Sequence, residues 1–205
     1  FWVKSLLWLM GLGVLGVICA ASIVVLVFSI IYKQLPAIDS LTDYRPKIPL
    51  RVYSAEGTLI GEFGEERRDF VHLKDMPVFV KNAVLAAEDN GFYQHSGIEF
   101  SGIARAALSN LLTGRKGQGG STITMQVARN FFLSSERTYT RKIYEVAMAY
   151  KIERHLTKDQ ILEVYLNQIY LGQRSYGFAA AAQAYFGKKL NELSVGEAAT
   201  IAGLP

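Results

Sequence analysis

The first residues that could do chemistry lie in the segment 88–97, where two adjacent carboxylates are followed by an aromatic side chain and a histidine. Glu88 and Asp89 stand at the end of an apolar stretch with helical spacing. A carboxylate beside apolar surface holds its proton more tightly than one in water, which suits it to general acid or base catalysis. The alternative, which the spacing alone favours, is a solvated helix end with a local Asp or Asn cap.

A second group follows the glycine-rich stretch 113–120 and could bind an anion. Four glycines and two cations in eight residues predict a mobile loop, and the helix that follows offers free backbone N–H groups at its start. A polar stripe on such a helix is more often a solvated surface, so both interpretations stay open. The polar residues that share this face are Thr122, Gln126, Arg129 and Asn130.

Further basic residues are natural partners for an anionic ligand. Arg141 lies one helical turn before Glu145, so the two could also form an exposed ion pair, which would contribute only about 0.3–0.5 kcal/mol. Lys142 adds a second cation here, and Lys188 is a further candidate for binding an anion. The stretch 158–167 is interpreted as structural, because its apolar residues form a core stripe.

Local patterns predict the elements that would position these groups. Two alternating segments, residues 50–54 and 58–63, flank Ala55-Glu56-Gly57 and predict a short hairpin. Capping boxes pair Thr157 with Gln160 and Ser194 with Glu197. The spacing predicts helices over residues 77–88, 99–112 and 137–156, one capped by Ser121 and running to Leu133, and one from Thr157 to Gly172.

The N-terminal part differs in composition from the rest. Between Leu6 and Ile31 no residue is charged, and this run is long enough to cross a bilayer as a helix. It exceeds the apolar core of a cleaved signal peptide, so we predict an uncleaved anchor. The sequence therefore divides into a short flank (residues 1–5), a transmembrane helix (6–32), a linker (33–49) and a folded domain (50–205). The prolines of the linker predict that it is extended.

Composition excludes several classes of function. Half of the residues are hydrophobic and the net charge is only +4. This composition argues against a disordered chain and against an extended surface that binds nucleic acid. Cys19 is the single cysteine, so neither a disulfide within the chain nor a cysteine zinc site is expected. The sequence motifs of zinc proteases and serine hydrolases are absent, and nucleic acid is not an expected partner.

Four motifs in this order resemble the peptidoglycan glycosyltransferase domain of bifunctional class A penicillin-binding proteins, of the Gram-negative type. They are E-D-x-x-F-x-x-H-x-G from Glu88, G-G-S-T-I-T-x-Q from Gly119, R-K-x-x-E from Arg141 and K-x-x-I-L-E-x-Y-L-N from Lys158. The resemblance covers about residues 50–205. It implies a mainly α, lysozyme-like fold with two lobes and a small β element, preceded by one transmembrane helix, with a transpeptidase domain beyond Pro205.

The resemblance also implies a reaction. The enzyme would polymerise lipid II into β-1,4-linked glycan strands by inverting transfer, with release of undecaprenyl pyrophosphate. Glu88 would activate the acceptor hydroxyl as a base, and Glu145 would be the second essential carboxylate, with a divalent cation, Mg²⁺ or Mn²⁺, as its candidate ligand. Cations that would stabilise the leaving pyrophosphate are Arg129, Arg141, Lys142 and Lys188. The residues that would shape the site are Asp89, Phe92, His95, Thr122, Gln126 and Asn130.

The same resemblance implies partners and a location. The expected partners are lipid II, the growing glycan strand and membrane lipid, with regulatory lipoproteins and the elongation or division machinery. The expected location is the bacterial inner membrane, crossed once, with the catalytic domain in the periplasm. Two other functions stay open: a membrane-bound lytic muramidase, and a non-catalytic membrane-anchored scaffold. The enzyme hypothesis requires Glu88 and the cations at positions 129–142 to line one groove.

Overall fold

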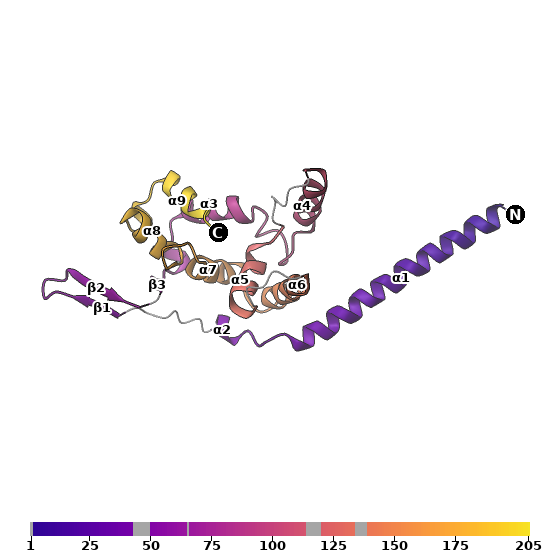
Figure 1. The fold of residues 1–205 in the computed structure, drawn as a ribbon, viewed down its shortest axis with the longest axis horizontal. Coiled ribbons are helices and arrows are strands. Elements are labelled where there is room, and N and C mark those ends of the chain that lie inside the picture. The colour runs from indigo at the N-terminus through magenta and orange to yellow at the C-terminus, as the bar shows by residue number, and fades with distance from the viewer. Residues whose placement is uncertain (1, 43–49, 65, 114–119, 134–138) are drawn as a thin grey trace. The chain divides into compact units, whose positions relative to one another are not determined.

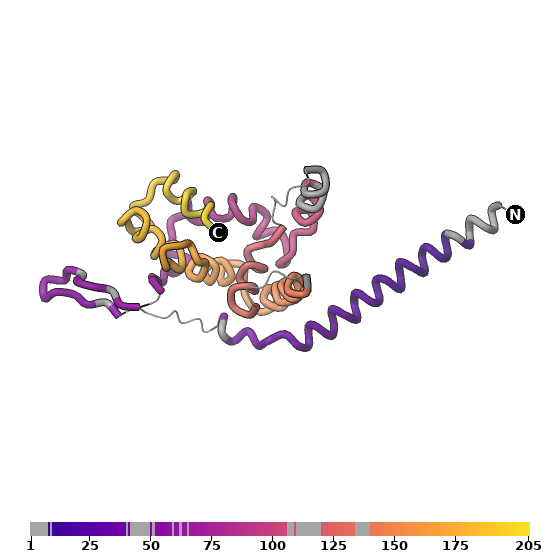
Figure 2. Tube along the Cα trace, in the orientation of Figure 1, coloured from indigo at the N-terminus to yellow at the C-terminus, as the bar shows by residue number. Residues whose placement is uncertain are grey.

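The computed structural model describes residues 2–42, 50–64, 66–113, 120–133 and 139–205 of the chain. Figure 2 follows the chain as a tube along its Cα trace. The predicted glycine-rich loop therefore lies almost entirely outside the described residues. Contacts divide the chain into two compact units, Phe1–Pro36 and Ala37–Pro205. The second unit is mainly helical, with two small sheets, which confirms the predicted fold class (Figure 1).

The first unit is built on one helix, α1 (Trp2–Gln34), which contains the predicted transmembrane segment. Within the stretch Met10–Gln34 a window of 18 residues has a mean hydropathy of 3.0, and the stretch is long and apolar enough, by length and composition, to cross a membrane. Ser29 donates its hydroxyl hydrogen to the backbone carbonyl of Val25 at 2.8 Å. The helix therefore satisfies this polar group internally, as a lipid environment requires.

The predicted extended linker, residues 33–49, contains a helical turn, α2 (Asp39–Thr42). Leu41 donates its backbone N–H to the carbonyl of Ile38 at 2.8 Å, and both side chains are buried. Prolines restrict helix only at and just before their own positions, so the expectation of a fully extended linker was wrong here. Residues 43–49 lie outside the described part of the chain.

The predicted hairpin is confirmed. β1 (Leu50–Tyr53) and β2 (Leu59–Phe63) pair antiparallel, with a register shift next to the turn. A second sheet, which the sequence did not predict, pairs β3 (Arg67–Arg68) in parallel with β4 (Ser175–Tyr176). Strands of two residues are too short to show an alternating pattern, so sequence periodicity could not reveal them.

Helices α3 and α5 to α9 of the second unit form two groups, and the contact of α7 with α8 is one of the places where these groups meet (Figure 1). In one group α5 packs against α6 and α7, and in the other α3 and α8 pack against α9. These groups agree with the two lobes that the resemblance implied. In chain order the helical elements are η1 (Leu73–Asp75), α3 (Val78–Glu88), α4 (Phe100–Thr113), α5 (Ile123–Phe132), α6 (Tyr139–Glu153), α7 (Lys158–Gln168), α8 (Phe178–Phe186), η2 (Leu190–Glu192) and α9 (Val195–Ala202).

Local signals predicted most helix starts correctly. The capping boxes that begin at Thr157 and Ser194 are both present. At α5 the prediction was wrong by one residue, because the hydroxyl of Thr122, not of Ser121, accepts the N–H of Met125, at 3.2 Å. Both residues carry a hydroxyl that can cap a helix, so the sequence alone does not decide between them.

The predicted end of α7 at Gly172 was wrong, because the helix ends at Gln168. The next residue, Ile169, is extended, and its carbonyl accepts the N–H of Gly177 at 2.8 Å. Gly172 has a φ of 85° and turns the chain, and its carbonyl accepts the N–H of Ser175 at 2.7 Å. A glycine in the left-handed region marks a turn as readily as a helix end.

Asn167 fixes α7 to the segment that precedes η1. Its side-chain oxygen accepts the N–H of Val71 at 2.9 Å, and its amide nitrogen donates to the carbonyls of Val71 and Glu163 at 2.9 and 2.8 Å. The residue is only 4% exposed, so these bonds replace water around a buried amide. This geometry agrees with the structural interpretation of residues 158–167.

We predict that Asn167→Ala lowers the free energy of unfolding by about 2–3 kcal/mol, because the half-buried backbone groups of Val71 lose their partners. Chemical denaturation followed by circular dichroism measures the change. Asn82→Ala, at an exposed position of α3, is the matched control and should change stability by less than about 0.5 kcal/mol. Equal effects of the two substitutions would contradict this role of Asn167.

Candidate active site

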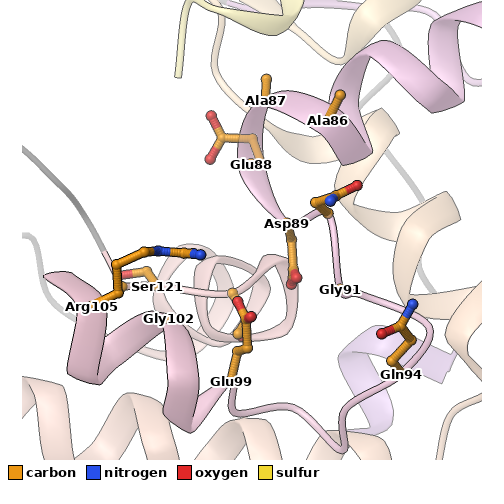
Figure 3. Close-up of a pocket in the computed structure, with 13 residues that line it drawn as sticks. Ala86, Ala87, Glu88, Asp89, Gly91, Gln94, Glu99, Gly102, Arg105 and Ser121 are labelled. Carbon is orange, nitrogen blue, oxygen red and sulfur yellow. The ribbon is translucent and has the colours of Figure 1, made fainter.

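The end of α3 borders a cavity of about 450 Å³, which Figure 3 shows. Glu88, the last residue of α3, is half-buried and lines this cavity. Glu99, directly before α4, and Arg105, in the second turn of α4, line it as well. Polar residues dominate the walls, and they include Asn90, Gln94 and Ser121. A half-buried carboxylate in such a cavity can accept a proton from a hydroxyl group of a ligand.

Asp89 has a structural environment, although it is adjacent to Glu88 in the sequence. It is 5% exposed, accepts the backbone N–H of Ile123 at 3.0 Å and faces Nε2 of His95 at 2.9 Å. Ile123 is the first residue of α5, so the carboxylate lies at the positive end of that helix. The interpretation of this segment as a solvated helix end was therefore wrong for Asp89.

The ring of His95 is held in one tautomer. Its Nδ1 accepts the backbone N–H of Gly97 at 3.1 Å, so the ring hydrogen resides on Nε2 and is donated to Asp89. Phe92 is fully buried and lies edge-on to His95, with ring centroids 6.3 Å apart. Gly97 has a φ of 88°, and a Cβ there would lie 3.3 Å from the carbonyl of Ala149 in α6. These contacts fix the loop that follows α3.

Tyr93 and Lys158 connect the same loop to α7. The Tyr93 hydroxyl donates to Asp159 at 2.8 Å, and burial followed by this bond raises the pKa of Tyr93 to about 12. The hydroxyl is therefore a donor throughout the neutral pH range. The Lys158 ammonium lies 4.3 Å from the ring centroid of Phe92 and 2.7 Å from Glu153. The loop is thus held from α5, α6 and α7.

Gln126 connects Glu88 to a cation. Its Nε2 donates to Oε2 of Glu88 at 2.5 Å, and its Oε1 lies 3.5 Å from Nη2 of Arg129. The expectation of a solvated polar face was wrong for Thr122 and Gln126, which are buried, whereas Asn130 is exposed. The reason is that α6 and α7 pack against α5, so only the end of its polar face reaches the surface.

Glu145 is buried and bound by two cations. It is 2% exposed, and its two oxygens accept from Arg141 at 2.6 Å and from Lys142 at 3.0 Å. Lys142 also donates to the hydroxyl of Ser121 at 2.7 Å, and Ser121 lines the cavity of Glu88. The expectation of an exposed Arg141–Glu145 pair was wrong. A buried carboxylate depends far more strongly on its partners than an exposed one.

The described residues offer few suitable ligands for the predicted divalent cation. Among the residues that the structure describes, no group of three His, Cys, Asp or Glu side chains could hold a metal ion. Both oxygens of Glu145 accept hydrogen bonds from cations, and Arg141 with Lys142 would repel a third positive charge. In this arrangement the residues around Glu145 are therefore a poor fit for Mg²⁺ or Mn²⁺.

The expectation of one groove is met only in part. Glu88 lines the first cavity, whereas Arg129 and Asn130 line a second cavity of about 460 Å³. Gln126 bridges the two, since it is bonded to Glu88 and contacts Arg129. The acid and this cation therefore line separate cavities and are connected through one amide side chain.

Several charged residues that line the two cavities were not identified from the sequence. Glu99 and Arg105 line the first, and Arg68 lines the second, with its guanidinium 4.2 Å from the ring centroid of Tyr176. Gly102 was an available signal, because a glycine inside a helix often marks a close approach. A Cβ at this position would lie 2.7 Å from Oε2 of Glu99. Arg68 had no comparable signal, because β3 is only two residues long.

These features define a class of protein. A half-buried acid in a polar cavity, linked by an amide to an arginine, suits group transfer to a hydroxyl on an anionic substrate. The preceding apolar helix suits a substrate that resides at a membrane. A family model described as Transglycosylase matches residues 56–205, and the chain belongs to this family. The family expected from the four motifs is therefore confirmed.

The similar proteins are much longer than this chain. Penicillin-binding protein 1A of Neisseria gonorrhoeae is 54% identical over 195 residues, which are 95% of this chain and 24% of that protein. Penicillin-binding protein 1A of Escherichia coli K12 is 50% identical over 194 residues, 95% of this chain and 23% of that protein. The crystal structure of Penicillin-Binding Protein 1A from Haemophilus influenzae has 33% identity and a TM-score of 0.37, and covers 78% of this chain and 14% of that one. The chain spans about a quarter of the length of the curated relatives it matches.

We predict that Asp89→Asn lowers the free energy of unfolding by about 2–3 kcal/mol. The new amide would set its NH₂ group against one of two donors, the N–H of Ile123 or Nε2 of His95. Urea denaturation measures the loss. Asp75→Asn, at an exposed position of η1, is the control and should be close to neutral. An unchanged midpoint for Asp89→Asn would refute its structural role.

Lys188 lines neither of the two cavities. Its ammonium lies 2.7 Å from Oε1 of Glu197, at the start of α9. This bond, and then the backbone N–H of Ser194, lower the pKa of Glu197 from the usual 4.5. A carboxylate whose pKa is lower in the folded state contributes stability above its usual pKa, and the contribution is lost as the pH falls through the folded value.

We therefore predict that the stability difference between wild type and Glu197→Gln is constant near neutral pH and shrinks as the pH falls below about 4.5. Denaturant midpoints of both proteins, measured from about pH 7 down to about pH 3, test this. A difference that stays constant over the whole range would contradict the Lys188–Glu197 pairing.

Proposed function

We propose that this chain polymerises lipid II into β-1,4-linked glycan strands and releases undecaprenyl pyrophosphate. The observation that carries the proposal is the half-buried Glu88 carboxylate, which lines a polar cavity and is connected through Gln126 to Arg129. Membership of the transglycosylase family supports it.

In the proposed reaction Glu88 is the general base. It takes the proton from the 4-hydroxyl of the acceptor sugar while that oxygen bonds to C1 of the donor sugar. The bond between C1 and the pyrophosphate oxygen breaks with inversion at C1, and the lipid pyrophosphate leaves with the electron pair. Residues that position the base or shape its surroundings are Asp89, Phe92, His95, Thr122 and Gln126.

Arg129 is the cation that we assign to the leaving pyrophosphate. That group gains negative charge as its bond to C1 breaks, and a planar guanidinium can donate two parallel hydrogen bonds to it. The contact of Arg129 with Gln126 is long, at 3.5 Å, so a phosphate oxygen can replace it at little cost. Asn130 lines the same cavity and can donate a further hydrogen bond.

Arg141 and Lys142 act on the substrate through their charge. Both are bonded to Glu145, so two cations face one carboxylate and the cluster attracts an anion. Lys142 reaches the first cavity through the Ser121 hydroxyl. Glu145 therefore acts by orienting cations, and a metal ion is not needed for this task. Lys188 has no part in this proposal because its partner is Glu197.

The apolar helix α1 gives the proposed reaction its location. We infer that α1 crosses the bacterial inner membrane once and that the folded domain is periplasmic. The lipid tail of the substrate stays in the bilayer, so a tethered enzyme meets it at a raised effective concentration. Membrane lipid and the growing glycan strand are then direct partners. Regulatory lipoproteins and the elongation or division machinery are proposed partners of the longer protein.

The test is a polymerisation assay with purified protein in detergent and labelled lipid II. Glycan strands are read on a gel, with and without the phosphoglycolipid inhibitor moenomycin. We expect strands from the wild type and their loss with the inhibitor. Small fragments released from finished sacculi, with no polymer made from lipid II, would favour a lytic muramidase instead.

Glu88→Gln should lower the polymerisation rate by at least about 100-fold, because glutamine keeps the shape of the side chain but cannot take up a proton. The thermal midpoint of this variant should match that of the wild type. Glu56→Gln, in the exposed hairpin turn, is the matched control and should keep the full rate. Normal polymerisation by a folded Glu88→Gln protein would overturn the assignment of the base, whereas a folded wild type that makes no strands would favour a scaffold.

A further inference from the structure

Tyr165 brings a buried hydroxyl group close to the acid and the cation of the site. It lies in α7, which packs against α5, and it is 1% exposed. Among the described residues, charges that act on its hydroxyl come from Glu88, at the end of α3, and from Arg129, on α5. The core stripe predicted for residues 158–167 accounts for the ring of Tyr165 but not for its hydroxyl.

The hydroxyl oxygen of Tyr165 is buried and has no hydrogen-bond partner among the described residues. A buried hydroxyl without a partner destabilises a fold, and phenylalanine would fill the same space without this cost. Such groups are rare in folded proteins, so each one calls for a physical reason. The charges of Glu88 and Arg129 both act on this hydroxyl, which suggests that the reason lies in the reaction rather than in folding.

The chemistry of its neighbours limits what the hydroxyl can do. A carboxylate only accepts hydrogen bonds and a guanidinium only donates them, whereas a phenol hydroxyl can do both. Burial, and then the negative charge of Glu88, raise the pKa of the Tyr165 hydroxyl, and the smaller effect of Arg129 lowers it. The group therefore keeps its proton and can donate it in a hydrogen bond to a carboxylate.

We propose that Tyr165 is a positioning residue whose hydroxyl links Glu88 to Arg129 while substrate is bound. It donates to the Glu88 carboxylate and accepts from the Arg129 guanidinium. Without substrate Gln126 makes this link, but through a contact of 3.5 Å to Arg129 that a pyrophosphate group can displace. Tyr165 then keeps the base and the cation aligned, and it makes and breaks no covalent bond. This inference rests on the proposed function.

Tyr165→Phe tests the proposal, because it removes only the hydroxyl. In the lipid II assay kcat should fall by about 10- to 100-fold, with KM changed by less than about 2-fold, since the lost interaction acts in the transition state. The acid limb of the pH profile should move to higher pH, because a carboxylate that loses a hydrogen-bond donor takes up a proton more readily. The thermal midpoint should be unchanged or higher, because the hydroxyl had no partner.

Tyr185→Phe is the matched control. The hydroxyl of Tyr185 has a partner, since it donates to the carbonyl of Leu171 at 2.7 Å, and it lines neither cavity. Its removal should lower the thermal midpoint by about 2–4 °C and leave kcat unchanged. Each substitution removes a tyrosine hydroxyl. Tyr165→Phe should lower kcat without lowering the thermal midpoint, whereas Tyr185→Phe should lower the thermal midpoint without changing kcat.

A wild-type kcat and pH profile in Tyr165→Phe would overturn the proposal, and so would a loss of rate accompanied by a lower thermal midpoint. Tyr165→Met also lacks the hydroxyl and must show the same kinetic loss, so a full rate in either folded variant is decisive. Failure of the proposed function gives a different result: the wild type makes no strands, or Glu88→Gln makes them normally.

Discussion

The hydrogen bonds that Asp89 accepts join the end of α3 to the start of α5, and the rest of the site depends on this junction. The carboxylate satisfies a backbone N–H that would otherwise be buried without a partner. It also orients His95, which accepts the N–H of Gly97, while the carbonyl of Gly97 accepts the hydroxyl of Thr122 at 2.6 Å. Glu88 directly precedes Asp89, so the same junction sets the direction of the acid.

The surroundings of three carboxylates determine whether each stabilises the fold or can accept a proton. Asp89 is buried between a helix start and a histidine, and Glu145 is buried between two cations. Removing a hydrogen-bond partner from either would leave a buried carboxylate less well compensated, so their bonds stabilise the fold. Glu88 is half-buried and accepts from the neutral amide of Gln126. A neutral donor orients a carboxylate without cancelling its charge, which leaves Glu88 as the one suited to accept a proton.

What the sequence could predict was encoded locally. The capping boxes and the hairpin turn depend on a few consecutive residues, and both were predicted correctly. The burial of Gln126 was not predictable, because periodicity assigns polar faces to solvent and two other helices enclose α5. Its bond to Glu88 joins positions 38 residues apart, and the bond of Asp89 to Ile123 joins positions 34 apart. Only the order of four motifs, compared with a known family, indicated that such distant residues meet.

The buried position of Glu145 also explains how cations are kept ready for an anionic substrate. Free basic side chains close to Glu88 would be drawn to its carboxylate and would neutralise the base. Glu145 instead holds Arg141 and Lys142 at 2.6 and 3.0 Å, in fixed positions. A carboxylate beside a pyrophosphate would by itself be repulsive, but here two cations outweigh it. Charges that are oriented before the substrate arrives need no reorganisation during the reaction, so in the proposed mechanism the ion cluster supports catalysis while the base stays free.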